Sequence, residues 1–205
     1  MFAYSHSPQS RLPSSQRGFN LLELLVVISI IGILAGLLYP AVTRIMLQTK
    51  MNRAENAAQN LKLAIKTYYT EYGTLPLEGS GSSEADQRLQ SDRNLMDILC
   101  ASETEAALKA NPRRTVFYTG RSARPLGQGR YHSGVHIGSD GAAELFDPWG
   151  EPYRVILDGN ANGRVDRPSW DHRNPSSEIF NTVLVWSAGP DQLDDSEEED
   201  NVKTW

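Results

Sequence analysis

The chain has 205 residues, a formal net charge of −5 and a single cysteine, Cys100. The excess of acidic residues disfavours broad nucleic-acid binding, which depends on Lys and Arg neutralising phosphates, so we expect no nucleic-acid partner. One cysteine also excludes an intramolecular disulfide and a cysteine-based zinc site.

The first predicted element is a membrane-spanning helix. Between residues 24 and 42 the only clearly polar side chain is Ser29, and about 20 apolar residues let a helix cross a bilayer. A secretory signal has a shorter apolar stretch, of about 7–15 residues, and a small-residue cleavage site that residues 43–46 lack. A buried core helix is the other alternative, but helices apolar on all sides belong mostly to membranes or large proteins. Arg11 and Arg17 precede the span and predict a cytoplasmic N-terminus.

One acidic residue interrupts this pattern. Glu23 is the only charged residue between positions 21 and 42. An ionised carboxylate in hydrocarbon costs several kcal/mol or more, so such residues are rare and usually functional. Either Glu23 has a partner, or its side chain extends to the membrane surface near the start of the helix.

Residues 17–24, with the sequence Arg-Gly-Phe-Asn-Leu-Leu-Glu-Leu, resemble the processing signal of type IV pilins and type II secretion pseudopilins. The resemblance implies that a membrane peptidase cuts between Gly18 and Phe19. Phe19 then becomes an N-methylated terminus, and Glu23 becomes the fifth residue of the mature chain. Loss of Arg11 and Arg17 leaves 18 basic and 25 acidic residues, a net charge of −7.

The same resemblance implies a partner for Glu23. In a filament of bundled helices, the new amine of Phe19 on one subunit pairs with Glu23 of its neighbour. A buried charge survives when it is paired, whereas an unpaired one costs about 3–5 kcal/mol. Asn20 departs from the family pattern, in which threonine is commoner, while Pro40 falls where the family often has a helix-disrupting proline.

A second, amphipathic half extends the helix. Apolar residues recur at i, i+3 and i+4 with charged residues between them, as is typical of a helix that is buried along one side. These apolar residues are Ala54, Ala57, Ala58, Leu61, Ala64, Ile65, Tyr68 and Tyr72. Gly73 and Pro76 predict its end, so the helix covers about residues 20–72, or roughly 80 Å at 1.5 Å per residue. Pro40 is expected to kink or locally unwind it.

The rest of the chain is predicted to form a small head. Residues 78–86 form a linker or surface loop, and residues 89–110 form a helix capped by Ser91 or Asp92 that residues 101–105 could interrupt. Short strands are expected at residues 115–118, 143–146, 152–157 and 181–186, with a tight turn at 147–150. The predicted divisions are a leader (1–18), the membrane and assembly half of the helix (19–43), its periplasmic half (44–76) and the head (77–205).

The end of the head extends the resemblance. The Asp-Pro-Trp-Gly turn at 147–150, the strand after it, and the segment from Val185 to Trp205 are similar to the major pseudopilin of type II secretion. The implied fold is α+β and type IV pilin-like, with a long N-terminal helix packed on a small C-terminal antiparallel sheet.

Two loops are candidate calcium sites. Residues 191–200 hold seven acids and no base, and calcium prefers six to eight oxygen ligands from such loops. In major pseudopilins the corresponding loop binds calcium, which implies the ligands Asp191, Asp194, Asp195 and Asp200. The family loop is rich in glycine where this chain has Glu197–Glu199, and the alternative is a solvated acidic tail.

The second loop resembles the first half of an EF-hand. Its candidate ligands are Asp158, Asn160, Asn162 and Asp166. The closing glutamate of an EF-hand is absent, because residue 169 is serine, and the alternative is an Asn-Gly hairpin turn. Calcium in either loop would stabilise a head that has no disulfide.

The predicted function is structural. The resemblance implies a subunit of a type II secretion pseudopilus that polymerises through its helix, with the prepilin peptidase, an inner-membrane assembly platform and minor pseudopilins as partners. It also implies an inner-membrane protein with a periplasmic head, which joins a periplasmic pseudopilus on assembly. One alternative is a major or minor type IV pilin, serving adhesion, motility or DNA uptake.

An alternative of another class is a membrane-anchored periplasmic binding protein or hydrolase. The sequence has no nucleophile elbow, phosphate-binding loop or dinucleotide fingerprint, so no enzyme is predicted. His132 and His136 are four residues apart, but Gly134 and Gly138 argue against a helix that would align them for a metal.

Overall fold

A computed structural model describes residues 20–77, 85–171, 177–194 and 201–205. The chain divides into two compact units, Met1–Ile45 and Met46–Trp205, and helix α1 (Leu21–Tyr72) has residues in both. The second unit is the head. Its other elements are β1 (Gln87–Gln90), α2 (Arg93–Cys100), α3 (Glu105–Ala110), β2 (Arg124–Gly127), β3 (Arg130–His132), β4 (Gly134–Ile137), β5 (Ala143–Phe146), β6 (Arg154–Leu157), β7 (Val165–Asp166), β8 (Glu178–Ile179), β9 (Val183–Ser187) and β10 (Val202–Lys203).

Helix α1 confirms the predicted long helix. It ends at Tyr72, and the next residue, Gly73, has a left-handed φ of +69° that favours glycine. The predicted apolar side is the buried one, comprising Ala54, Ala58, Leu61, Ala64, Ile65 and Tyr68, with Ala57 and Tyr72 partly buried. The three alanines have short side chains, so the helix can lie close to the rest of the head.

The helix is continuous through Pro40. Proline removes one backbone donor and its ring crowds the carbonyl of the residue four positions earlier, which here is Gly36. The flanking turns keep their helical conformation, so the local unwinding that the sequence suggested at this position is not observed.

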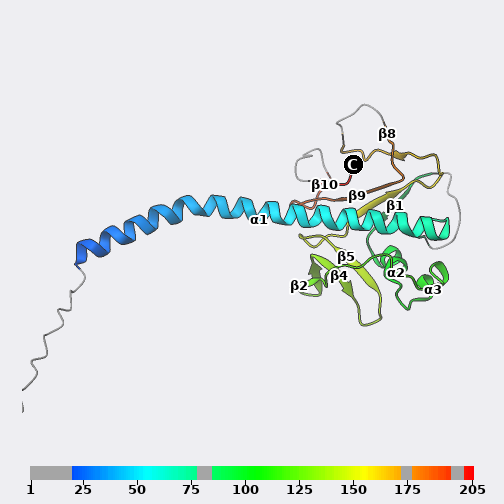
Figure 1. The fold of residues 1–205 in the computed structure, drawn as a ribbon, viewed down its shortest axis with the longest axis horizontal. Helices are drawn as coiled ribbons and strands as arrows, with labels where there is room; N and C mark the ends of the chain where they lie inside the picture. The colour runs from blue at the N-terminus through cyan, green and yellow to red at the C-terminus, as the bar shows by residue number, and fades with distance from the viewer. Residues whose placement is uncertain (1–19, 78–84, 172–176, 195–200) are drawn as a thin grey trace, which may run out of the picture. The chain divides into compact units, whose positions relative to one another are not determined.

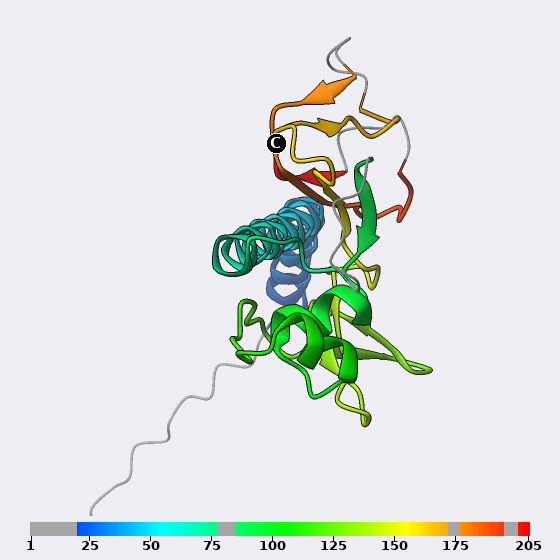
Figure 2. The same ribbon diagram turned by 90° about the vertical axis from the view of Figure 1, so that its right-hand side faces the viewer.

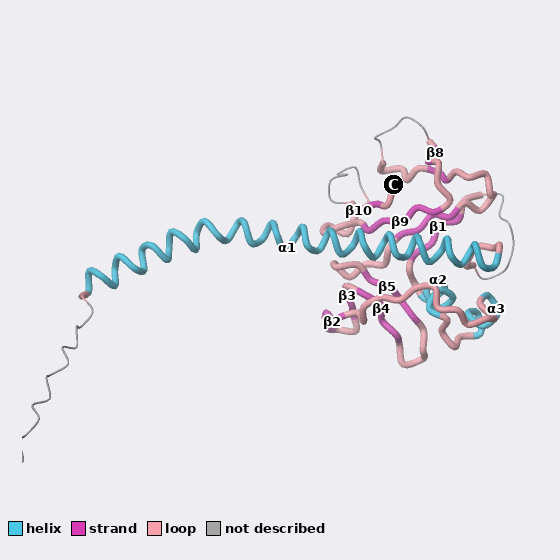
Figure 3. The backbone as a smooth tube through the Cα atoms, in the orientation of Figure 1, coloured by secondary structure: helices cyan, strands magenta, loops and turns pink. Residues whose placement is uncertain are grey.

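A four-stranded antiparallel sheet in the order β1-β6-β9-β10 forms the centre of the head (Figure 1). Separate two-stranded pairs are formed by β2 with β3, β4 with β5, and β7 with β8. The tube in Figure 3 shows the same strands alongside the second half of α1. The strands predicted at 143–146, 152–157 and 181–186 are therefore confirmed as β5, β6 and β9, with slightly different ends.

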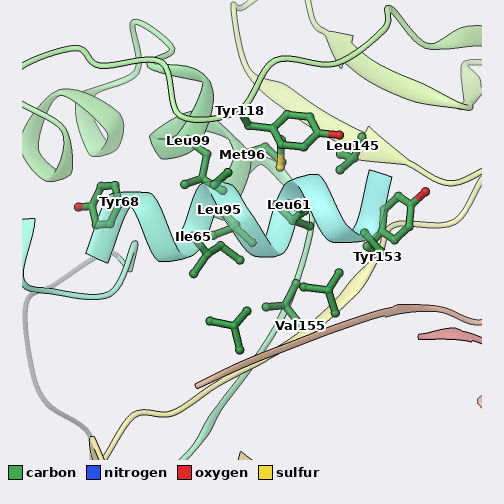
Figure 4. Close-up of a cluster of buried hydrophobic side chains, with 14 of the residues drawn as sticks. Leu61, Ile65, Tyr68, Leu95, Met96, Leu99, Tyr118, Leu145, Tyr153 and Val155 are labelled. Atoms are coloured by element: carbon green, nitrogen blue, oxygen red, sulfur yellow. The ribbon is translucent and has the colours of Figure 1, made fainter. Parts of the chain in front are cut away.

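The central sheet is covered on both faces, and this explains why all five residues of β9 are buried. Val183 and Val185 pack with α1 and α2, in the core whose side chains Figure 4 shows between the helix and the strands. Leu184 and Trp186 point to the opposite face, where they pack with Trp170. Side chains alternate across a strand, so one strand serves two cores.

The single helix predicted at 89–110 is wrong, and Ser91 explains why. This buried residue accepts a hydrogen bond from the Tyr153 amide (2.8 Å) and donates one to the Leu145 carbonyl (2.6 Å) through its hydroxyl. Residues 87–90 before it pair with β6 as an edge strand. Asp92 then caps α2, as predicted, and Ala101 ends it in a left-handed conformation, so the expected interruption separates α2 from α3.

The strand predicted at 115–118 is also absent. The amides of Phe117 and Tyr118 both donate to the carbonyl of Leu99, at 2.8 and 3.0 Å, so this segment closes the end of α2 instead of joining a sheet. The tight turn at 147–150 is confirmed. Asp147 is fully buried, and one of its oxygens accepts hydrogen bonds from the amides of residues 149–151 while the other accepts one from Ser187 Oγ.

Candidate functional site

The first half of α1 exposes its apolar side chains in the isolated chain. The large apolar side chains from Leu21 to Val42 are 43–80% exposed, and none of these residues is buried. By length and composition, α1 is the one helix among the described residues that could span a membrane. Burying a large apolar side chain contributes about 1.5–3 kcal/mol, so this segment has a strong tendency to enter lipid or a helix bundle.

Glu23 lies in the first turn of this exposed segment. The positive end of the helix dipole favours a carboxylate there, by about 0.3–1 kcal/mol at an exposed position. The other polar group in the apolar run is already satisfied, because the hydroxyl of Ser29 donates to the Leu25 carbonyl at 2.7 Å. Gly18 and Phe19, the predicted processing residues, lie outside the described residues.

A match to a known protein family falls on this same segment. Residues 13–39 match the family model of the prokaryotic N-terminal methylation motif. That match includes the predicted cleavage position and Glu23. This N-terminal segment is type IV pilin-like.

Relatives among characterised proteins are pilus proteins. Fimbrial protein EcpC of Eikenella corrodens is 38% identical over 74 residues, which are 36% of this chain and 48% of the relative. The type IV major pilin PilE of Neisseria gonorrhoeae is 34% identical over 70 residues, 34% of this chain and 42% of that pilin. The type IV major pilin PilA of Myxococcus xanthus is 36% identical over 62 residues, which are 30% of this chain and 28% of that pilin.

The chain therefore spans less than half the length of each of these relatives, and no solved structure matches it. The resemblance of the head to pilins comes from its architecture. A long N-terminal helix packed with antiparallel strands is a type IV pilin-like α+β fold, as the sequence predicted.

The described part of the acidic C-terminal loop is held by protein groups. Asp194 accepts a hydrogen bond from Trp186 Nε1 at 2.9 Å and pairs with Arg154 at 2.5 Å, so both its oxygens are engaged. Asp191 accepts from the Leu193 amide at 2.9 Å and is exposed. Asp195 and Asp200 lie outside the described residues, so calcium in this loop stays a prediction.

The second loop folds around its own amides. Asp158 accepts hydrogen bonds from the amides of Asn162 (3.1 Å) and Gly163 (2.7 Å). Asn160 also accepts from the Asn162 amide, at 3.0 Å, and Asn162 accepts from the Arg164 amide, at 2.7 Å. Since β7 pairs with β8 and not with β6, the loop does not join two paired strands as the Asn-Gly hairpin turn, the alternative to calcium, would.

Asp86 is a neighbour of this loop that the sequence did not reveal. Pairing of β1 with β6 places it beside Asp158, and one of its oxygens accepts a hydrogen bond from the Asp166 amide at 2.6 Å. Burial raises the pKa of Asp86, and the carboxylates of Asp166 and Asp158 raise it further. Within the described ranges, however, no group of three or more acidic, His or Cys side chains has the arrangement of a metal site.

We expect calcium to raise the melting temperature of the soluble head, residues 46–205, relative to the same protein in chelator. A ligand that binds only the folded state stabilises it, by about 2.7 kcal/mol at 100 times its Kd. Asp191→Asn should reduce the rise if calcium occupies the C-terminal loop, and Asp166→Asn if it occupies the second. Melting temperatures that are equal in calcium and in chelator would contradict both sites.

A companion experiment measures the melting temperature of the Asp86→Asn head without calcium. Because its folded pKa is raised, the ionised form opposes folding above that pKa, and protonation removes this cost as the pH falls through it. In chelator we therefore expect the substitution to raise the melting temperature slightly at pH 7 and not at pH 3. The gain in stability at pH 7 should be less than about 1 kcal/mol, because the carboxyl group is only partly buried. An equal effect at both pH values would show that ionisation of Asp86 is not its cause.

A second set of residues that the sequence did not reveal covers the face of the central sheet opposite α1. The Asp171 side chain is fully buried, pairs with Arg167 at 2.6 Å and accepts a hydrogen bond from Trp205 Nε1 at 2.9 Å. Lys203 Nζ lies 3.9 Å from its other oxygen. The rings of Trp170, Trp186 and Trp205 surround this group, with pairwise centroid distances of 5.9–6.0 Å.

The last residues are also bonded to the helix and the sheet. Lys62 of α1 donates to the Thr204 carbonyl at 2.8 Å, and the Thr204 hydroxyl accepts from the Val185 amide at 3.2 Å. Burial and the nearby Lys66 lower the pKa of Lys62. These noncovalent contacts tie the end of the chain to helix α1 and to the central sheet.

Proposed function

We propose that this chain is a structural subunit of a type IV pilus-type filament. It is inserted in the inner membrane with a cytoplasmic N-terminus, cleaved between Gly18 and Phe19, methylated on Phe19 and polymerised through the first half of α1. The prepilin peptidase and an inner-membrane assembly platform are its partners. The observation that carries the proposal is a type IV pilin-like motif on a helix whose large apolar side chains from Leu21 to Val42 are exposed in the described chain.

Physical chemistry supports a filament over a solitary membrane anchor. An anchor needs only apolar length, and a carboxylate inside that length opposes insertion. In a bundle of identical helices, the positively charged amine created at Phe19 of one subunit lies beside the Glu23 carboxylate of its neighbour, in a region of low dielectric. A pair of this kind is favourable only when both partners are in register, so it selects one arrangement of neighbouring subunits.

A pilus is the preferred assembly because the relatives are pilus proteins. A type II secretion pseudopilus, with minor pseudopilins as partners, is the second candidate. The turn at Asp147 followed by β6, and the return of the chain to Trp205 through β10, favour it because they follow the pattern that resembles the major pseudopilin. Loss of protein secretion on deletion of the gene would favour the pseudopilus, and loss of surface filaments would favour the pilus.

Mass spectrometry of the full chain from its native host tests the processing step. We expect a mature N-terminus at Phe19 carrying one methyl group, and sheared or membrane-associated filaments that contain it. Gly18→Glu should leave the uncleaved chain in the membrane, because the peptidase would meet a large charged side chain at the bond it cuts. An intact leader on the wild-type chain would contradict the proposal and favour a membrane-anchored binding protein or hydrolase.

A further inference from the structure

A groove of about 420 Å³ lies in the head between α1 and the segment that leads into β2. Three of the residues that line it are the arginines Arg53, Arg121 and Arg124, and no acidic residue lines it. We call it the arginine groove. All three arginines are exposed, and none of them forms an ion pair with another described residue.

Most other arginines of the head are compensated. Carboxylates pair with Arg93, Arg113, Arg114, Arg154, Arg164 and Arg167. Three uncompensated guanidinium groups along one groove repel each other, and they fit a ligand that brings several carboxylates or phosphates. The chain has a net charge of −5, so this groove is a local exception to an acidic surface.

The backbone of the groove is rigid. The Val135 amide donates to the Arg121 carbonyl at 2.7 Å, and the Ala123 amide donates to the Val135 carbonyl at 2.8 Å. At Gly134 a Cβ would lie 2.3 Å from the Arg121 carbonyl oxygen, so this close approach requires glycine. The backbone of Arg53 on the other wall belongs to helix α1, which is packed on the head through the next residue, the buried Ala54. A wall that is already ordered loses less conformational entropy when a partner binds.

The chain itself contains a segment of the opposite charge. Residues 197–200 are Glu-Glu-Glu-Asp, within a stretch from 191 to 200 that has seven acids and no base. The described residues on either side of this segment are anchored at the central sheet. Asp194 is bonded to Trp186 of β9, and the buried Asn201 directly precedes β10.

Strand β10, which follows the acidic segment in the sequence, and strand β2, whose Arg124 lines the arginine groove, belong to opposite sides of the head. β10 lies on one side of α1 and the β2–β3 pair lies on the other, as Figure 1 and the turned view in Figure 2 both show. We infer that the arginine groove receives the acidic segment, residues 195–200, of a neighbouring copy of this chain. Two different complementary surfaces on one subunit make a head-to-tail contact, which repeats from copy to copy and extends as a filament instead of closing as a dimer.

This contact rests on the proposed function and deepens it, because it adds a specific contact between neighbouring heads to polymerisation through α1. The test uses the full chain in cells that assemble it. Arg53→Glu, Arg121→Glu and Arg124→Glu together should reduce the filament yield at least tenfold, and adding Glu197→Lys, Glu198→Lys and Glu199→Lys should restore it. Arg113→Glu with Arg114→Glu is the control, since these arginines lie outside the groove, and should leave the yield near wild type.

A cross-link keeps the test valid if the charge-reversed chains fold poorly. Ser122→Cys, whose position lines the groove, is combined with Glu198→Cys in a Cys100→Ser background. Under mild oxidation, filaments should yield a ladder of covalent multimers, whereas either cysteine alone should yield dimers at most. A monomeric product, or no disulfide in assembled filaments, would overturn the contact.

Other outcomes separate this inference from the proposed function. Wild-type cells without filaments would overturn both. Normal filaments from the triple arginine variant would overturn this contact alone. Duplex DNA that binds the wild-type head, and not the triple variant, while filament yield is unchanged would assign the groove to a phosphate polymer and would also overturn it.

Discussion

Replacing Glu23 with leucine should leave the chain in the membrane, correctly cleaved, and abolish filaments. The substitution makes the span more apolar, so insertion does not suffer. In the proposed filament, assembly loses the carboxylate that pairs with the amine of a neighbouring Phe19, and an uncompensated charge in a dry helix bundle costs about 3–5 kcal/mol. Since each 1.4 kcal/mol is a factor of ten, we expect association to weaken by roughly 100- to 4,000-fold per subunit.

The measurement compares cleaved chain in membranes with chain recovered in sheared filaments. Ser29→Ala is the matched control, because Ser29 is the other polar residue of the span and its hydroxyl already bonds to the helix backbone. It should assemble normally. Glu23→Gln separates charge from polarity and should assemble as poorly as Glu23→Leu if the amine requires an ionised partner. Filaments of normal yield from Glu23→Leu would show that the pairing does not drive assembly.

Replacing Asp171 with alanine should destabilise the head more than any exposed ion pair does. The change leaves Arg167, which is 13% exposed, without its carboxylate and removes the acceptor for Trp205 Nε1. Breaking a buried pair by deleting one partner costs about 3–5 kcal/mol. For a head of this size each kcal/mol lowers the melting temperature by about 2–4 °C, so we expect a fall of roughly 6–20 °C.

Asp140→Ala is the matched control for Asp171→Ala. Asp140 also pairs with an arginine, Arg93 at 2.7 Å, but both side chains are more than half exposed. Exposed pairs contribute about 0–1 kcal/mol, so its melting temperature should change by only a few degrees. Denaturant unfolding of the soluble head, residues 46–205, gives the free energies. Equal losses for the two variants would mean that Asp171 does not hold the far face of the sheet together.

The sequence predicted the helix well because its signals are local. The apolar run, the i, i+3, i+4 spacing from Ala54 to Tyr72 and the stop at Gly73 depend only on neighbouring residues. The strands β5, β6 and β9 were also predicted, since each is a short β-rich run beside a turn signal. The division of 89–110 into a strand and two helices was not, because it depends on the bonds of Ser91 to Tyr153 and Leu145, more than 50 positions away.

The functional residues divide in the same way. Glu23 can be singled out from the sequence, because a carboxylate in an apolar run is anomalous wherever the rest of the chain lies. Asp171 cannot, since nothing near it in the sequence distinguishes it from a surface aspartate. Its importance comes from Trp205, 34 positions later, and from the loss of solvent around both.

The sequence by itself therefore determined the membrane helix, its processing motif and the anomalous carboxylate, because hydrophobicity and charge along a helix act over a few residues. Only the tertiary structure decided which acids are held inside the head and which arginines share a groove. Arg53 and Arg121 are 68 positions apart in the sequence, yet both line the groove. The Val135 amide of β4 holds the backbone of Arg121 there, across the groove from α1. Such proximity follows from packing, which no local pattern encodes.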